Sequence, residues 1–169
     1  GRNTLSNTEY EAGAGGSVPV YSKNDQLVRM GADLTWFRYD HNEYQFSFGN
    51  GGYFSPQSFF ALTFPVTYTG HQDQWSWKLG GRLGYQTYHS NASSYYPTNS
   101  VLQNKATALS PQNAMLPGQS TSGLTGGADG FLHYQLSPAL NLGIDLSYQK
   151  AGPWNEVSAF LSAHYNLSE

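Results

Sequence analysis

Apolar and polar residues alternate along most of this chain, in segments of roughly ten residues separated by turns. In the segment 59–68, every even position carries an apolar or aromatic side chain, and the odd positions are mostly small or hydroxylated. Successive side chains of a β-strand point to opposite faces, so this alternation predicts strands with one apolar and one polar face.

Eight segments show the pattern, which predicts an all-β fold with antiparallel, up-and-down connections. They span about 10–20, 27–39, 44–48, 58–68, 75–88, 124–136, 140–149 and 156–167. Strands of this length, alternating and joined by turns, are typical of a transmembrane β-barrel. A soluble β-sandwich also alternates and is the competing interpretation.

Two features favour the barrel. The charges inside the strands fall on the polar face, where a sandwich would place charge on the outside together with more Lys and Glu. Aromatic residues gather near strand ends on the apolar face, as the interfacial girdles of a membrane protein require. These are Tyr10, Trp36, Tyr44, Phe48, Tyr68, Trp75, Trp77, Tyr148 and Tyr165.

Composition excludes several classes of protein. No window holds the ~18 consecutive apolar residues of a membrane-spanning helix, so a helical membrane protein is excluded. The chain has no cysteine, which rules out disulfides and thiolate metal sites. A net charge of -3 gives no electrostatic reason to expect a nucleic acid partner. The lack of cysteine is compatible with the cytoplasm and with bacterial surface proteins. The predicted barrel favours the bacterial outer membrane, with outer-membrane lipid around the protein.

Periodicity stops between residues 91 and 121, in a segment rich in Ser, Asn, Gln, Thr and Pro. Loops this long are usually functional or disordered, and we expect a long extracellular loop. Strict up-and-down threading then places 21–25, 49–57 and 150–153 outside. The same threading places 40–43, 70–74, 137–138 and both chain ends in the periplasm.

The polar face defines the candidate site residues, which we expect to line the lumen. They are Glu11, Arg29, Asp33, Lys78, Arg82, Tyr88, Asp129, Phe131, His133, Asp145 and Glu156. Carboxylates on this face can accept hydrogen bonds from hydroxyl groups, and its rings, with Phe37 and Phe160, can stack on sugars. The simpler interpretation is that these charges form salt bridges and hydrate the lumen.

Catalysis is an alternative interpretation, since His133, Asp145 and Ser147 share one side of a predicted hairpin. A lipid-modifying hydrolase would use such a set, but His133 is expected closer to Asn141 than to Ser147. We therefore predict no enzyme activity. The five histidines have no spacing typical of metal ligands, so we predict no metal and no cofactor. A structural barrel that anchors an adhesin is the other alternative.

Four motifs stand out in the middle of the chain: the run from Gly51 to Gln57, Phe64-Pro65-Val66, Trp75-Ser76-Trp77 and Ser94-Tyr95-Tyr96-Pro97. Together they resemble the C-terminal region of cellulose synthase operon protein C, the outer-membrane exporter of bacterial cellulose secretion. The similarity is strong from about Phe48 to Tyr165 and weaker upstream.

The resemblance implies a 16-stranded barrel that follows a periplasmic array of tetratricopeptide helices and passes a glucan out of the cell. It also implies a periplasmic secretion complex as partner, although the chain contains no 34-residue helical repeat. We accordingly expect a polysaccharide-export channel of cellulose biosynthesis and biofilm formation. Tyr95, Tyr96 and Pro97 would then form a lid at its mouth. Cellulose, a modified glucan and poly-N-acetylglucosamine all remain open as the polymer.

Residues 1–169 are expected to form a single barrel domain or the C-terminal part of a larger one. An eight-stranded barrel is just filled by side chains, yet glycines recur on the inward face, at 13, 15, 31, 80, 84, 127 and 143. Such glycines would leave voids unless water or substrate filled them. The larger pore is therefore favoured over an abbreviated eight-stranded relative.

Overall fold

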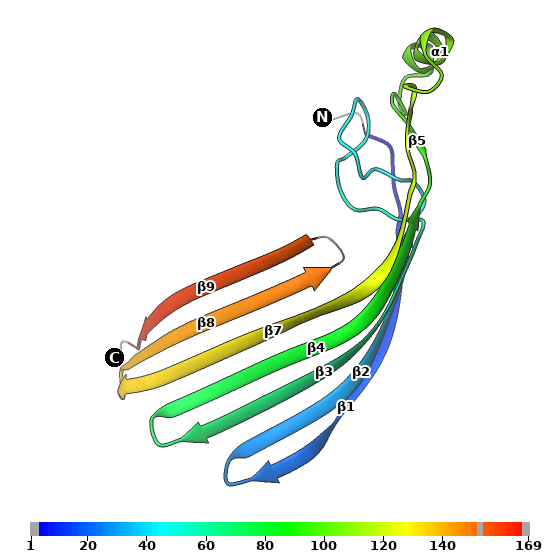
Figure 1. The fold of residues 1–169 in the computed structure, drawn as a ribbon. Helices are drawn as coiled ribbons and strands as arrows, with labels where there is room; N and C mark the ends of the chain where they lie inside the picture. The colour runs from blue at the N-terminus through cyan, green and yellow to red at the C-terminus, as the bar shows by residue number, and fades with distance from the viewer. Residues whose placement is uncertain (1–3, 152–153, 167–169) are drawn as a thin grey trace. The chain divides into compact units, whose positions relative to one another are not determined.

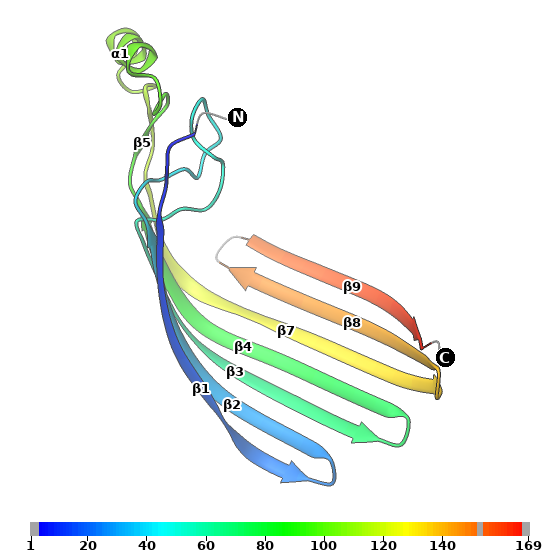
Figure 2. The same ribbon diagram turned by 180° about the vertical axis from the view of Figure 1, so that it is seen from behind.

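The computed structural model describes residues 4–151 and 154–166. Its main feature is a seven-stranded sheet with the order β1-β2-β3-β4-β7-β8-β9, seen from opposite sides in Figures 1 and 2. Its strands are β1 (Glu9–Lys23), β2 (Gln26–Tyr39), β3 (Ser58–Gln72), β4 (Trp75–Ser90), β7 (Gln119–Ser137), β8 (Leu140–Ala151) and β9 (Trp154–Tyr165). The all-β, antiparallel prediction is confirmed.

Tight turns join neighbouring strands at one end of the sheet. Asn24 and Asp25, between β1 and β2, have φ angles of 49° and 59°, and Asp73 after β3 has a φ of 53°. Asn and Asp tolerate this left-handed conformation, and two-residue turns of this kind match the twist of a hairpin. Between β7 and β8, the Ser137 hydroxyl accepts a hydrogen bond from the amide of Leu140 at 3.1 Å.

The third predicted strand, 44–48, is wrong, and with it the prediction of eight strands, because the described residues form seven in this sheet. Residues 40–57 connect β2 to β3 as one loop. Gly49 and Gly52 have positive φ angles of 125° and 75° and allow the chain to reverse. Only an isolated bridge between Phe46 and Gly51 remains. The girdle prediction required Tyr44 and Phe48 to lie at strand ends. Both lie in the loop instead.

Buried Glu43 holds this loop closed. Its backbone carbonyl accepts hydrogen bonds from the amides of Gly52 (2.8 Å) and Tyr53 (3.1 Å). Its carboxylate Oε2 accepts from the amide of Gly51 at 2.9 Å, and its own amide donates to the Ser55 hydroxyl at 2.6 Å. These bonds satisfy the backbone locally, so the segment has no need of a neighbouring strand.

Because 44–48 is not a strand, the predicted order of outer and periplasmic connections changes. The turns at 24–25, 73–74 and 138–139 share one end of the sheet, and the connections 40–57 and 91–118 share the other. Segments 21–25 and 40–43 were therefore placed on the wrong sides. An odd number of antiparallel strands also puts the start of β1 and the end of β9 at opposite ends of the sheet, whereas the predicted threading placed the first strand's start and the last strand's end on the same side.

Two predicted segments extend beyond the described residues. Residues 152 and 153 of the predicted 150–153 connection and Leu167 of the eighth predicted strand lie there.

The connection between β4 and β7 contains structure that the sequence pattern did not predict. It holds β5 (Ser93–Ser94), α1 (Ser100–Leu109) and β6 (Met115–Leu116), of which β5 and α1 are labelled in Figure 1. Strands β5 and β6 form an antiparallel pair. Asn99 caps α1 by accepting a hydrogen bond from the Leu102 amide at 3.0 Å. The Gln103 side chain accepts from the Tyr96 amide and donates to the Ala114 carbonyl, which ties the helix to its flanks.

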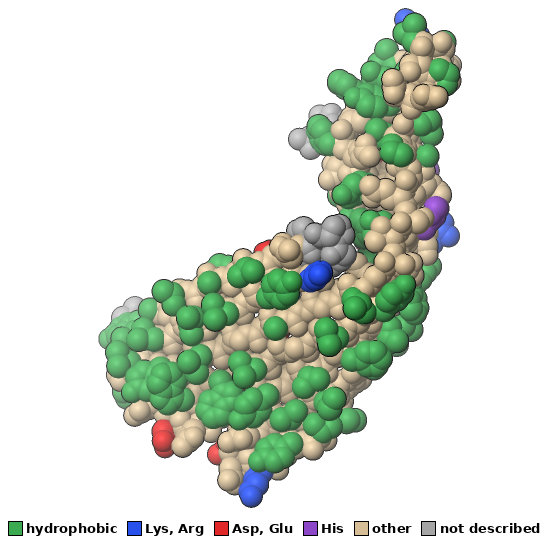
Figure 3. All heavy atoms as spheres, in the orientation of Figure 1, with side chains coloured by type: hydrophobic (Ala, Val, Ile, Leu, Met, Phe, Trp, Pro, Cys, Tyr) green, Lys and Arg blue, Asp and Glu red, His purple; other side chains and the backbone are tan. Residues whose placement is uncertain are grey.

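The sheet has one apolar face, and that face is exposed. Directly opposed pairs such as Leu132 with Ile144 and Tyr148 with Val157 define it. Leu161 is 84% exposed, and the buried hydrophobic residues in the described part of the chain are two alanines, Ala61 and Ala114. In Figure 3, hydrophobic side chains spread over the strands and the few charged ones lie near strand ends. The described residues include no helix long and apolar enough to cross a membrane.

Two compact units divide the chain, and each is described by itself. The loop unit comprises Gly1–Gly13, Thr35–Ala61 and Gln86–Ser122. The turn unit comprises Ala14–Leu34, Leu62–Tyr85 and Gly123–Glu169.

Replacing Glu43 should loosen the 40–57 loop. In Glu43→Ala the amide of Gly51 loses its acceptor, a loss of about 1–3 kcal/mol for a buried group. We expect amide hydrogen exchange of residues 51–53 to accelerate by roughly tenfold or more, while exchange in the β8–β9 hairpin stays unchanged. Glu156→Ala, which removes an exposed carboxylate, is the control. Unchanged exchange at 51–53 would show that the carboxylate does not hold the loop.

Candidate functional site

Strand register places the predicted residues of β7, β8 and β9 on one face. Asp129 lies opposite Ser147, and Phe131 lies opposite Asp145. Asp145 in turn lies opposite Phe160. Directly opposed residues share a face and have Cβ atoms about 4.5–5.5 Å apart. This side of the sheet, which carries Asp129 and Asp145, is called the polar face below.

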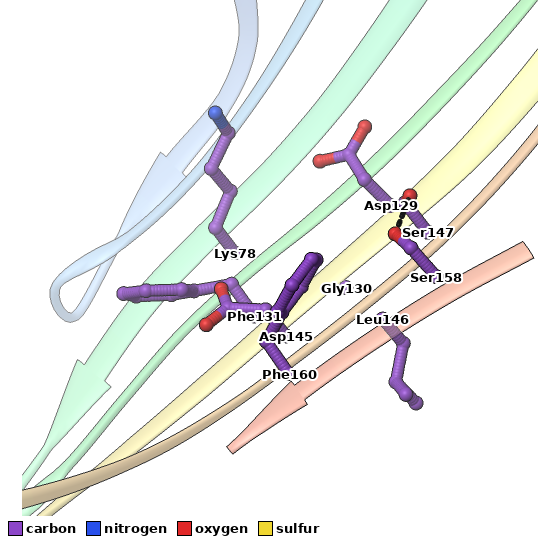
Figure 4. A pocket seen from close by; sticks show the side chains of 9 residues that line it. All are labelled: Lys78, Asp129, Gly130, Phe131, Asp145, Leu146, Ser147, Ser158 and Phe160. Atoms are coloured by element: carbon purple, nitrogen blue, oxygen red, sulfur yellow. Dashed lines mark hydrogen bonds between the residues drawn. The ribbon is translucent and has the colours of Figure 1, made fainter. Parts of the chain in front are cut away.

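A cavity of about 500 Å³ lies on the polar face within the turn unit. Figure 4 shows its side chains, with Lys78 contributed by β4. The rings of Phe131 and Phe160 lie beside the Asp145 carboxylate, and Leu146 is directed to the other side of the sheet. The lining therefore combines two aromatic rings with charged and hydroxyl groups.

Two serines in this cavity were missed as binding residues. The hydroxyls of Ser147 and Ser158 form a hydrogen bond of 2.7 Å across β8 and β9. Their positions alternate correctly with the apolar residues, so the signal was present in the periodicity. The sequence pattern points to Ser147 only as a candidate nucleophile.

Glycines on the polar face are covered by neighbouring side chains. The carboxylate of Asp129 lies over Gly80, and the imidazole of His133 lies over Gly143. Asp33 covers Gly15 in the same way. The expectation that these glycines leave voids for water or substrate is therefore wrong at these positions. They let polar side chains lie flat along the sheet.

Charged groups around the cavity are not neutralised by partners. Within residues 4–151 and 154–166, Lys78, Asp129 and Asp145 form no ion pair and no side-chain hydrogen bond. Arg29 differs, because its guanidinium donates to the hydroxyl and the carbonyl of Ser17 at 3.1 and 2.9 Å. The salt bridges of the simpler interpretation are thus not formed at the cavity, and its polar groups remain available to a ligand.

The remaining lumen candidates are more dispersed. Arg82 borders a separate apolar groove of about 800 Å³ in the turn unit. Glu156 lies opposite Gln149 on the polar face of the β8–β9 pair. Glu11 and Tyr88 belong to the loop unit.

Tyr88 joins an aromatic cluster in the loop unit. Its ring packs edge-on against Phe54, with centroids 5.0 Å apart. Phe37 stacks on Phe59 at 4.3 Å, and Phe54 also contacts both of these rings. Nearby, the Tyr53 hydroxyl accepts a hydrogen bond from Asn7 at 2.8 Å. Burial raises the pKa of Tyr53 above its ordinary value.

The predicted lid residues are attached to the 40–57 loop. The ring of Tyr96 stacks on Phe48, with centroids 5.7 Å apart and an interplanar angle of 23°. The Ser47 hydroxyl donates to the Tyr95 carbonyl at 2.9 Å. Pro97 packs against Gly49, where a side chain would have little room. The two loops therefore form one connected structure.

The catalytic arrangement considered from the sequence is not assembled. His133 lies opposite Gly143, four residues along β8 from Ser147. At about 3.4 Å per residue this places the two backbones too far apart for a direct nucleophile-to-base contact. The hydroxyl of Ser147 is bonded to Ser158 instead.

Comparison with known proteins identifies the relatives of this chain. Residues 1–168 match the family model described as cellulose synthase operon protein C C-terminus. A cellulose synthase 2 operon protein C from Komagataeibacter xylinus is 45% identical over 99% of this chain and 13% of its own length. A cellulose synthase operon protein C from Xanthomonas axonopodis pv. citri is 30% identical over 95% of this chain and 12% of its own length.

The chain thus spans about an eighth of the length of these relatives. The family match covers nearly every residue, including both loops and the strands that form the cavity. The resemblance drawn from the sequence motifs is confirmed, and the chain belongs to the family of cellulose synthase operon protein C C-terminal regions.

Proposed function

We propose that this chain forms part of the wall of an outer-membrane channel that exports a polysaccharide, with cellulose as the polymer. The observation that carries this proposal is the two-sided sheet. One side exposes large apolar residues, and the other carries a cavity lined by rings, hydroxyls and charged groups.

Lipid is the environment that suits the apolar side. Monomeric soluble proteins rarely expose a contiguous apolar surface of this kind. Leu83 on β4 and Val157 on β9 are 75% and 77% exposed, and β7 and β8 lie between these two strands. Acyl chains would cover such residues without any need for a protein core.

Aromatic residues near the tight turns support the same environment. On the apolar face, the ring of Trp75 packs against Tyr134, with centroids 4.6 Å apart. Trp77 packs against Tyr68 at 6.1 Å and covers Gly70. Trp and Tyr are enriched at membrane–water interfaces. We propose that these rings form the girdle at the periplasmic interface.

The polar side suits a neutral, hydroxyl-rich polymer. Asp129 and Asp145 can accept hydrogen bonds from sugar hydroxyls, and Lys78 can donate. Phe131 and Phe160 offer ring faces for the apolar faces of a pyranose. Mixed charge without a dominant sign hydrates the path without trapping the chain at one point. The other candidates on this path are Glu11, Arg29, Asp33, Arg82, Tyr88, His133 and Glu156.

A larger barrel is proposed from the sheet edges. In the described part of the chain β1 and β9 do not pair with each other, so each has an open edge. Within lipid, unpaired backbone groups are too costly, and spanning sheets must close. We propose that further strands complete the barrel, up to the 16 that the family resemblance implies, and that this chain provides seven.

Orientation follows from the connections. Bacterial barrels have short periplasmic turns and longer extracellular loops. We therefore propose that the turns at 24–25, 73–74 and 138–139 face the periplasm and that 40–57 and 91–118 face outward. Transport rather than catalysis is proposed. The periplasmic part of a secretion complex is the proposed partner.

Removing the rings of the cavity should impair export. We expect full-length exporter carrying Phe131→Ala and Phe160→Ala to secrete several-fold less polymer, because each ring contact contributes about 0.5–1.5 kcal/mol. The measurement is secreted polymer per cell at equal surface levels of the protein. Phe64→Ala, on the apolar face, is the matched control and should secrete normally. Equal secretion by all three proteins would place these rings outside the path.

Deleting the 91–118 connection should distinguish a channel from an anchor. If Tyr95, Tyr96 and Pro97 form a lid, loss of residues 95–118 should raise the conductance of the full-length protein in planar bilayers. An anchoring barrel should show conductance near zero before and after the deletion. That second result would contradict the export proposal.

A further inference from the structure

A second cavity, of about 360 Å³, lies wholly within the loop unit. Residues of the 40–57 loop form one side, and residues just before and within α1 form the other. Its volume falls in the range of about 300–1,000 Å³ that is usual for small-ligand sites. Neither the lumen prediction nor the lid prediction accounts for it.

Aromatic rings with unusual exposure border this cavity. Phe46 and Phe48 lie in the 40–57 loop, and their large apolar side chains are 71% and 69% exposed. One side of the Phe48 ring stacks on Tyr96, with centroids 5.7 Å apart and an interplanar angle of 23°. This contact restrains the ring, and a restrained, exposed ring loses less conformational freedom when it binds a flat apolar partner.

The polar groups that the described residues bring to the cavity are neutral. Among residues 4–151 and 154–166, the lining includes Ser47, Asn50, Thr98 and Asn99, and contains no Asp, Glu, Lys, Arg or His. Hydroxyls and amides both donate and accept hydrogen bonds. The cavity therefore favours an uncharged ligand rich in hydroxyl groups.

The buried side chain of Asn50 is an independent observation, because one of its hydrogen-bonding atoms is unsatisfied among the described residues. It is 1% exposed, and its amide nitrogen donates to the Ser47 hydroxyl at 2.6 Å and to the Ser94 carbonyl at 3.0 Å. Its Oδ1 is buried and accepts no hydrogen bond from the described residues. Buried acceptors are normally satisfied. A ligand hydroxyl, or a water held by the ligand, could supply the missing donor.

We infer that this cavity binds a pyranose segment of a β-linked glucan. A pyranose ring has apolar faces, which would stack on Phe48 and Phe46, and a rim of hydroxyls, which would meet Asn50, Thr98 and Asn99. The choice of a glucan rests on the proposed function, whereas the preference for a neutral saccharide rests on the lining alone. The site is separate from the cavity on the polar face, because the two share no residue.

The probe is cellohexaose, added to the full-length protein in detergent micelles, with binding measured by calorimetry and by saturation-transfer NMR. We expect Phe48→Ala to weaken binding about threefold to tenfold, the loss typical of one aromatic contact. Phe48→Leu keeps an apolar contact with Tyr96 but removes the ring, and should weaken binding to a similar extent. Leu109→Ala, at an α1 residue that is 88% exposed and outside the lining, is the matched control.

A separate arm uses Phe131→Ala with Phe160→Ala, which changes only the cavity on the polar face. The inference requires that this variant still binds cellohexaose at the loop site. It is overturned if the wild-type protein shows no binding, or if only the polar-face variant loses it. It is also overturned if Phe48→Ala and Phe48→Leu bind as tightly as Leu109→Ala. Failure of secretion by the polar-face variant tests the export proposal alone, so the two results are distinguishable.

Discussion

The described sheet lacks a hydrophobic core, and the rest of the structure depends on that fact. Seven strands expose Leu, Val, Ile and aromatic side chains on one face, and only two alanines are the buried hydrophobic residues of the described chain. In water, burial of apolar surface is the dominant favourable term in folding. Such a sheet can satisfy it only if something outside the described chain covers the apolar face. Lipid does this in the proposed barrel.

The polar face follows a different packing rule. Asp129 over Gly80 and His133 over Gly143 show charged and aromatic groups lying across glycines of neighbouring strands. Because these side chains lie along the sheet, they project little from it. The rings of Phe131 and Phe160 therefore stay accessible beside Asp145. A translocating polymer would meet a surface of hydroxyls, charges and ring faces instead of a close-packed interior.

Alternation was sufficient to predict seven of the strands, because a period of two is set by the backbone itself. It failed at 44–48, where aromatic and polar residues alternate although the segment lies in a loop. Hydrogen bonds from the amides of Gly51 and Gly52 to Glu43 determine the loop conformation of that region. The alternation of apolar and polar residues does not reveal these bonds. That single error reversed two predicted connections.

Parts of the candidate site were also predictable, and for the same reason. The face of Asp129, Phe131 and Asp145 follows from their odd positions, whereas the cavity they share with Lys78 depends on how β4 and β7 pair. Helix α1 was missed because it is short and polar, although Asn99 is a favourable N-cap residue. The loop cavity joins segments about fifty residues apart, which periodicity cannot relate.

The most direct test uses thiol accessibility, and the lack of cysteine in this chain makes the labelling specific. Single cysteines at Leu146 and Ser147, in the full-length protein with any other cysteines removed, would be probed in lipid vesicles. The account predicts that a membrane-impermeant thiol reagent modifies Ser147→Cys and not Leu146→Cys, and that a lipid-phase quencher reaches a fluorophore only at position 146. The reverse pattern, with 146 shielded from lipid and 147 in contact with it, would contradict the two-sided wall.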